Sequence, residues 1–256
     1  MNKHKNYSIL TIVFLFFLSS CVSKKELLYL QDIQALNKSK VLSSKNSLQE
    51  NDIIKIDVTS LEIDASKPYN KVPLVNNVGN SLQLIQLNGY LVSTKKTINF
   101  PVLGEISVAE KTSQDLEQYL KNLLEAGGHL INPSVTVRLL NSKVTILGEV
   151  RNPGTFTFTE KNISLLQAIG LAGDLTIDGD RKNVTIIRQS NGQRTTTKID
   201  LTIASWLNGF YQNIQPNDVI IVSPNTKKVA SAGLIGNIST VLSIASILLS
   251  TIILIK

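Results

Sequence analysis

The sequence is poor in the side chains that bind metals or form disulfides. Its 256 residues include one Cys and two His. A single Cys cannot form an intrachain disulfide, and a zinc site needs several nitrogen or sulfur donors. Cys21 and His4 lie near the start of the chain, and His129 is isolated in a stretch that we interpret as a loop. We therefore expect neither a metal site nor a bound cofactor.

A catalytic arrangement is equally hard to find. Four acidic residues, Asp52, Asp57, Glu62 and Asp64, lie near one expected strand, and paired carboxylates can hydrolyse glycosides. The same four acidic residues are also expected on a solvent-exposed strand face with aspartates in the adjoining turns, where they have no catalytic role. A nucleophile with a neighbouring base is not visible either. The sequence therefore predicts a protein that is not an enzyme.

The charge balance is mildly basic, with 26 Lys and Arg against 19 Asp and Glu. Removal of residues 1–20 would take away Lys3 and Lys5 and no acidic residue, which leaves an excess of five basic residues. This excess would suit an anionic partner such as an acidic polysaccharide. Runs of Lys and Arg interleaved with aromatic side chains are missing, so we expect no nucleic-acid binding.

The start of the chain has the features of a secretory signal. Lys3 and Lys5 precede a ten-residue hydrophobic run at 9–18, which is too short to span a bilayer and fits the apolar part of a signal peptide. The run ends in Leu18-Ser-Ser-Cys21, which resembles a bacterial lipobox. That resemblance implies cleavage after residue 20 and a Cys21 carrying acyl chains such as palmitate. An ordinary signal peptide with a nearby Cys is the alternative.

The other end of the chain has no charged residue from 229 to 255. As a helix this segment would be about 40 Å long, which exceeds the roughly 30 Å hydrocarbon core of a bilayer. Lys227, Lys228 and Lys256 flank it. We predict a transmembrane helix, and the alternative is a buried helix that ends a soluble domain.

Small residues recur along this segment at spacings of three and four, which places them on one helical face. They are Ala232, Gly236, Ser239, Ser243, Ser246 and Ser250. A face of small residues usually packs against another membrane helix, and it can also face water inside a ring of helices. We predict that Gly236 and the four Ser residues, here called the stripe, line a pore or a helix–helix seam.

Strands and two helices alternate between these ends, which predicts an α+β fold. Residues 21–48 are polar and are expected to be a lipidated tether, and residues 64–88 a long loop. A first unit at 49–140 has a helix that begins at a capping box, Thr112-Ser-Gln-Asp115, and stops at Gly127. A second unit at 141–226 has a capped helix from Ser164 and a hairpin at Asn191-Gly192.

Several stretches of the two units resemble a known family. The stretches Ile98-Asn-Phe-Pro-Val-Leu-Gly104 and Asn132-Pro-Ser-Val-Thr-Val137 are similar to the polysaccharide export domain. Asn51-Asp-Ile-Ile54 resembles that domain's Gly-Asp-x-Ile entry, with Asn in place of Gly. Val144-Thr-Ile-Leu-Gly-Glu-Val-Arg-Asn-Pro-Gly154 is similar to a soluble-ligand-binding β-grasp domain. The order of lipobox, export domain, β-grasp domain and C-terminal helix resembles that of the outer-membrane lipoproteins that export capsules and exopolysaccharides.

This resemblance implies a function and partners. Members of the family form ring-shaped homo-oligomers, commonly octamers, whose C-terminal helices build a pore in the outer membrane while the other domains lie in the periplasm. The implied partners are the polysaccharide and an inner-membrane polysaccharide co-polymerase or tyrosine kinase. The alternative is a periplasmic ligand-binding or scaffold lipoprotein of an envelope assembly that has no pore.

Overall fold

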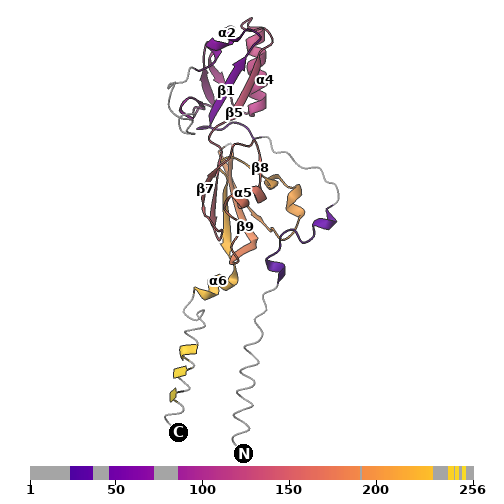
Figure 1. Cartoon of the computed structure of the whole chain (residues 1–256), viewed down its shortest axis with the longest axis vertical. Coiled ribbons are helices and arrows are strands. Elements are labelled where there is room, and N and C mark those ends of the chain that lie inside the picture. The colour runs from indigo at the N-terminus through magenta and orange to yellow at the C-terminus, as the bar shows by residue number, and fades with distance from the viewer. Residues whose placement is uncertain are drawn as a thin grey trace, which may run out of the picture.

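The computed structural model describes residues 24–36, 46–71, 86–190 and 192–232, together with 242–244, 246–247 and 250–251. Figure 1 shows two α+β domains stacked end to end. The first domain begins at residue 46 and the second at residue 143, with the second domain below the first in this view. The predicted α+β class is confirmed.

The first domain is built on a three-stranded antiparallel sheet. Its order is β2 (Tyr90–Leu91), β1 (Ile53–Thr59) and β5 (Ser134–Leu139). Alternate side chains of β1 are buried, as the period of a half-buried strand requires. A hairpin of β3 (Thr97–Phe100) and β4 (Gly104–Ser107) completes the strands.

Helix α4 (Ser113–Ala126) covers the core of this domain. It begins at the predicted capping box, in which Thr112 and Asp115 bond to each other's backbone N–H groups. Leu116, Leu120 and Leu124, spaced by four residues, are fully buried. Gly127 caps the helix end, and Gly128 follows with φ of 66°.

Part of the expected loop at 64–88 is in fact helical. A short α2 (Ile63–Ser66) continues into the 3-10 helix η3 (Lys67–Tyr69). The Asn70 side chain explains this turn, because it bonds to both backbone groups of Val58 on β1 and to the carbonyl of Ser66. Such side-chain bonds to a distant strand have no periodic signal in the sequence.

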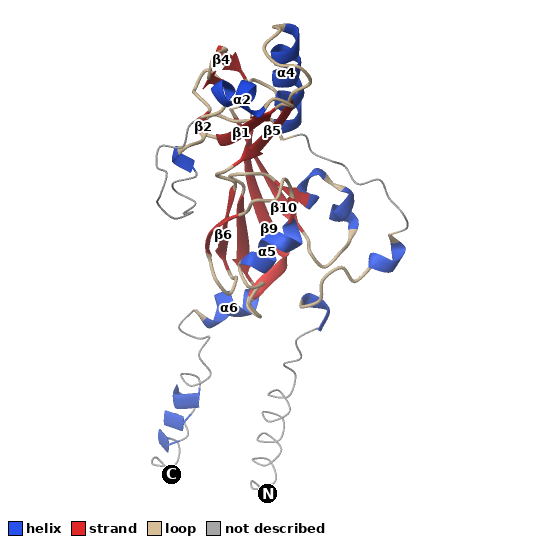
Figure 2. Cartoon of the chain, turned by 45° about the horizontal axis from the view of Figure 1, so that its top comes forward, coloured by secondary structure: helices blue, strands red, loops and turns tan. Residues whose placement is uncertain are grey.

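The second domain contains a five-stranded sheet (Figure 2). Its order is β10 (Gln193–Ile199), β9 (Gly179–Ser190), β12 (Val219–Pro224), β6 (Lys143–Gly148) and β7 (Gly154–Thr157). Only the central β12 and β6 run parallel to each other. As predicted, β9 and β10 form a hairpin around residues 191–192.

Short elements close the core of this domain. Helix α5 (Leu165–Leu171) begins at the predicted capping box of Ser164 and Gln167. A two-stranded pair joins β8 (Ile163–Ser164) to β11 (Asn213–Ile214). The 3-10 helices η4 (Ser205–Asn208) and η5 (Phe210–Gln212) complete the domain. Trp206 is buried in the core.

The two domains contain the same turn, which the sequence analysis missed. It spans 49–52 before β1 and 215–218 before β12, and reads Gln-x-Asn-Asp in both places. The Asn has a positive φ in each copy, 66° for Asn51 and 68° for Asn217. Glycine adopts this backbone at no cost and Asn tolerates it better than most residues. This explains why Asn can replace the Gly that the family resemblance leads one to expect at position 51.

Residues 24–36, here called the strap, contact the second domain and include two 3-10 helices, η1 (Lys24–Glu26) and η2 (Ile33–Ala35). The Leu30 N–H donates to the carbonyl of Leu201 at 3.0 Å, and the Gln31 N–H to that of Thr202 at 2.8 Å. The expected tether at 21–48 is thus in contact with the second domain over this part of its length.

The second domain ends in the short helix α6 (Thr226–Ser231). The helical residues described beyond it are 242–244, 246–247 and 250–251. Among the described residues, no helix has both the length and the hydrophobicity needed to cross a membrane. Most of the predicted transmembrane segment at 229–255 lies outside those residues.

Candidate functional site

The acidic residues near β1 do not form a catalytic pair. Asp52 is buried, whereas Asp57 lies an odd number of residues away, on the opposite face of the strand. Asp57 is half-exposed and pairs with Lys55 at 2.9 Å, and Asp64 pairs with Lys67 at 2.6 Å. Both carboxylates therefore pair with a nearby lysine. In the described part of the chain, no group of His, Cys, Asp and Glu could hold a metal ion.

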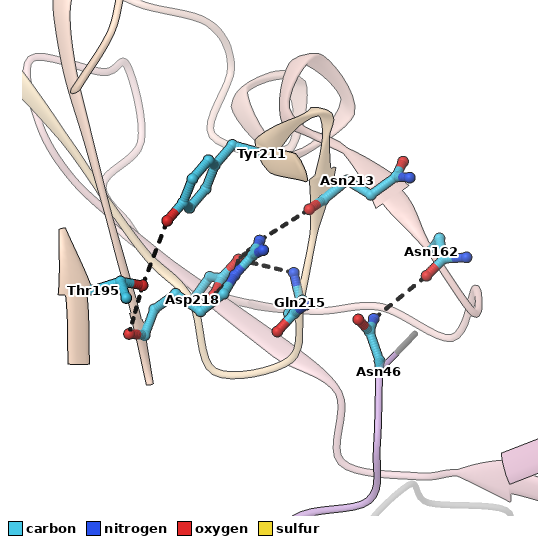
Figure 3. A network of polar contacts seen from close by, with 8 residues as sticks. Asn46, Asn162, Thr195, Tyr211, Asn213, Gln215 and Asp218 are labelled. Carbon is cyan, nitrogen blue, oxygen red and sulfur yellow. Dashed lines mark hydrogen bonds and ion pairs between the residues drawn. The ribbon is translucent and has the colours of Figure 1, made fainter. Parts of the chain in front are cut away.

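A cleft of about 650 Å³ lies where the two domains meet. Amide and hydroxyl side chains dominate its lining, among them Asn46, Gln49, Gln114, Asn162 and Gln189. The Asn46 Nδ2 donates to Asn162 Oδ1 at 3.4 Å, which joins the domains across the cleft (Figure 3). Such groups can hydrogen-bond to sugar hydroxyls.

Asp52 contributes a buried carboxylate to this cleft. Its Oδ2 accepts the N–H of Gln49 at 2.8 Å. Burial raises the pKa of Asp52 to about 6, because a desolvated carboxylate favours its neutral form. The acid therefore titrates close to neutral pH, where exposed aspartates are fully charged.

The equivalent aspartate of the second domain, Asp218, binds an arginine instead. Arg188 Nη2 lies 2.7 Å and its Nε 3.0 Å from the Asp218 carboxylate, and both side chains are buried. Arg188 also donates to the Asn213 carbonyl at 2.9 Å and lies over the Tyr211 ring. Figure 3 shows Tyr211, Asn213 and Gln215 around Asp218. Since Gln215 lines the cleft, this network fixes one of its walls.

A second feature lies at the end of the second domain remote from the cleft. Residues 174–179, here called the base loop, contact both the strap and α6. Tyr29 of the strap donates a hydrogen bond to Asp174, and the guanidinium of Arg181 lies 5.3 Å from the Tyr29 ring centroid. The Asp32 Oδ1 accepts the N–H of Ala204 at 2.6 Å, which holds the strap further along.

Helix α6 meets the same base loop. The Asn225 N–H donates to the carbonyl of Asp178 at 2.7 Å, and its Nδ2 donates to that of Ile177 at 3.1 Å. Lys228 Nζ pairs with the Asp178 carboxylate at 3.1 Å. The strap and α6, which lead to the predicted membrane attachments, thus both contact the base loop. Figure 1 shows α6 at the end of the second domain remote from the first.

Two of the stripe residues, Gly236 and Ser239, and the predicted lipidation site Cys21 lie outside the described residues. Ser243, Ser246 and Ser250 are helical and exposed. The Ser246 hydroxyl donates to the Leu242 carbonyl and the Ser250 hydroxyl to the Ser246 carbonyl, each at 2.7 Å. Bonds of this kind satisfy a hydroxyl within its own helix, so a serine face can lie against a neighbouring helix without further partners.

The residues that meet at the base loop were not predicted from the sequence. Tyr29, Asp174 and Asn225 are far apart in the sequence, and none belongs to a recognisable motif. Only Asn225, a preferred N-cap residue directly before α6, gives a local signal.

Comparison with known proteins identifies two family models. Residues 42–140 match the family described as polysaccharide biosynthesis/export protein, and residues 143–198 match the SLBB domain. The junction between the matches coincides with the boundary between the two structural domains.

Curated relatives are similar over part of their length. The chain is 32% identical over 106 residues to the EPS I polysaccharide export outer membrane protein EpsA of Ralstonia nicotianae, covering 40% of this chain and 27% of that protein. It is 26% identical over 159 residues to EpsA of Ralstonia solanacearum, covering 60% and 41%. It is 28% identical over 160 residues to the capsule polysaccharide export outer membrane protein CtrA of Neisseria meningitidis serogroup A, covering 61% and 39%. The chain thus spans between about a quarter and two fifths of the length of these relatives.

Proposed function

Residues 42–140 belong to the polysaccharide biosynthesis/export family and residues 143–198 form an SLBB domain, and we propose that the chain is a subunit of an outer-membrane channel for capsular or extracellular polysaccharide. The family resemblance predicted from the sequence is confirmed. The relatives are named as outer-membrane export proteins, in agreement with the expectation that the chain is not an enzyme.

One observation supports the channel more than any other. The strap and α6 meet at the base loop, on the side of the SLBB domain opposite the export domain. Acylation of Cys21 and insertion of 229–255 would therefore attach the same end of the molecule to one membrane. The export domain would then project away from the outer membrane into the periplasm.

A pore requires several copies of the chain. One helix cannot surround an aqueous path, and spanning segments must satisfy their backbone within themselves. We propose a ring in which the stripe residues of 229–255 line the pore or the seams between helices. The octamer common in the family is the expected stoichiometry. An inner-membrane co-polymerase or tyrosine kinase is the expected partner of the export domains.

The alternative is a scaffold or ligand-binding lipoprotein without a pore, and the polar cleft between the domains favours it. A cleft lined by amides and hydroxyls can bind a soluble saccharide without conducting it. The two functions differ in their need for residues 229–256. A channel depends on them, whereas a scaffold held by Cys21 does not.

The experiment is complementation of a strain that lacks this chain. We compare the full chain with a form truncated after residue 228, and measure polysaccharide at the cell surface. The domains carry their own cores and caps, so the truncated form should remain a folded lipoprotein, which protease resistance of the purified protein checks. Export should be lost. Normal surface polysaccharide with the truncated form would favour the scaffold.

A further inference from the structure

We propose that the base loop is a membrane-contacting element, and that Ile177 at its tip enters the headgroup layer of an anionic phospholipid surface. This inference rests on the proposed function, because it requires that Cys21 and 229–255 attach the chain to a membrane. It goes further by assigning a lipid-binding role to a part of the SLBB domain itself.

The N-terminal attachment would hold the base loop close to the lipid. Cys21 precedes the first described residue, Lys24, by only three residues, and three extended residues span at most about 11 Å. η1 lies against β9, the strand that begins at the end of the base loop. Since Tyr29 is bonded to Asp174, the acylated residue has little freedom to move away from the loop.

The C-terminal attachment would also hold the base loop close to the lipid. Asn225 caps α6 and bonds to the carbonyls of Ile177 and Asp178. The uncharged segment begins four residues later, at Val229, which is 59% exposed. The base loop therefore lies between two chain segments that both lead into lipid.

The base loop presents an apolar side chain in a fixed position. Ile177 is 72% exposed. Its neighbour Thr176 is held by Glu149, through its N–H to the Glu149 carbonyl at 3.0 Å and its hydroxyl to the carboxylate at 2.9 Å. Gly179 packs so closely that a Cβ would come within 2.8 Å of the Glu149 carbonyl oxygen. An isoleucine held outward on a rigid turn next to two membrane attachments is suited to insertion at the interface.

Exposed lysines around the loop can contact anionic headgroups. Lys25, Lys182 and Lys227 are exposed in the segments that border the loop. Of the acidic residues there, Asp178 pairs with Lys228, Asp174 accepts bonds from Tyr29 and the Leu175 N–H, Asp180 accepts the Lys182 N–H, and Glu26 is exposed. Basic side chains near a membrane are attracted to anionic lipids over about one Debye length.

The test is lipid proximity of single probes in the full-length, acylated chain. Because Cys21 is the only native Cys and is acylated under the proposed function, Ile177→Cys would provide the one free thiol for a fluorophore. The protein is reconstituted into vesicles of phosphatidylcholine and phosphatidylglycerol that contain a headgroup spin label. Ile131→Cys is the matched control, since Ile131 is 84% exposed and follows α4. The first turn of α4 and the β5 residues 136–139 line the cleft, so Ile131, which lies in the loop between the other ends of these two elements, is remote from the second domain.

We expect the lipid spin label to quench the probe at 177 at least about twofold more strongly than the probe at 131. Equal quenching of both probes, with a soluble quencher reaching both, would overturn the inference. Protection of residue 177 from both quenchers would also overturn it, because the side chain would then be buried against another copy of the chain.

A separate step distinguishes failure of the proposed function. Vesicles carrying the unlabelled chain are washed at alkaline pH, which removes proteins that are not integrated. Release of the chain would refute its membrane attachment, and the inference with it. Retention of the chain together with a water-exposed residue 177 would refute the inference alone.

Discussion

Asp52 and Asp218 occupy the same position in two copies of one turn, but only Asp218 has an arginine partner. Each accepts the N–H of the Gln three residues earlier at 2.8 Å. Arg188 neutralises Asp218, whereas no ion pair to Asp52 occurs among the described residues. Burial raises the pKa of both carboxyls, and the Arg188 guanidinium partly offsets this effect at Asp218. The same local sequence therefore gives one buried carboxylate with a cationic partner and one without.

The first prediction concerns the pH dependence of Asp52. Burial raises its pKa from 3.8 to about 6, so the folded state retains a proton that the unfolded chain releases. The stability that this proton provides is complete below about pH 3.8 and is lost as the pH rises to about 6. The shift corresponds to at most about 3 kcal/mol. Asp52→Asn should remove most of this dependence, as measured by chemical denaturation at a series of pH values.

The control for this prediction is Asp57→Asn, which changes a half-exposed carboxylate on β1, the strand that Asp52 precedes. It should leave the pH dependence between 3.8 and 6 unchanged. If Asp52→Asn and Asp57→Asn give the same pH profile as the unmodified chain, burial of Asp52 has no energetic consequence and the account of this turn is wrong.

The buried ion pair of the SLBB domain should be costly to break. Arg188→Met or Asp218→Asn alone leaves a buried polar group without its partner, which costs about 3–5 kcal/mol. The double variant should cost clearly less than the sum of the two, as a double-mutant cycle measured by denaturation would show. The exposed pair Lys55 and Asp57 is the control, and it should contribute no more than about 1 kcal/mol. If the losses in free energy of unfolding from the two single variants simply add in the double variant, the contact between Arg188 and Asp218 does not stabilise the domain in the way proposed.

Much of the fold follows from local signals. The two capping boxes, the glycine that stops α4 and the hairpin at 191–192 were all predicted, because caps and turns depend on neighbouring residues. The strand expected near Asp52 and Asp57 is present as β1. The strap, the base loop and the Asn70 contacts were not predicted. They depend on hydrogen bonds between segments up to 172 residues apart, and these leave no periodic pattern.

The candidate site likewise combines features that the sequence shows with features that only the structure shows. The lipobox resemblance at Cys21 and the spacing of the stripe are sequence patterns. The cleft between the domains is not, because it is formed by the first turn of α4, by β5, by the end of β9 and by loops of both domains. The two copies of the Gln-x-Asn-Asp turn could have been found from the sequence, but a four-residue repeat has little weight until both copies are seen to share positive φ and a buried Asp.

Cys21 should be acylated at the mature N-terminus. The Leu18-Ser-Ser-Cys21 junction follows a ten-residue hydrophobic run and resembles a lipobox. Mass spectrometry of the N-terminal peptide from the membrane-extracted protein measures this directly. An unmodified Cys21, or a mature chain that begins elsewhere, would contradict the prediction. Cys21→Ser serves as the control that cannot be acylated.

The stripe should differ from its neighbours in water accessibility. We introduce single Cys residues at 239, 243, 246 and 250, and at Leu242 and Leu249 as controls, in the acylated background. If the stripe lines a wet pore, an aqueous thiol reagent should label the four stripe positions and spare 242 and 249. Equal labelling or equal protection of both sets would rule out this orientation.

Substitutions separate a wet pore from a dry seam. A charge facing lipid at mid-membrane costs roughly 2–3.5 kcal/mol on insertion scales, and this cost recurs in every subunit. Ser243→Lys should therefore preserve assembly better than Leu242→Lys if the stripe faces water. If the stripe is a dry seam, Ser243→Leu should disrupt assembly, because the larger side chain prevents close approach of the helices. Size-exclusion chromatography in detergent reads out both cases.

The mass of the detergent-solubilised assembly shows whether the chain can form a channel, because a channel of single helices requires several copies. Native mass spectrometry of the full-length chain should give one closed oligomer, eight subunits being the number that the family resemblance implies. The form truncated after residue 228 serves as the comparison and should lose this assembly or form it only weakly. A full-length chain that is monomeric when extracted under mild conditions would contradict the account.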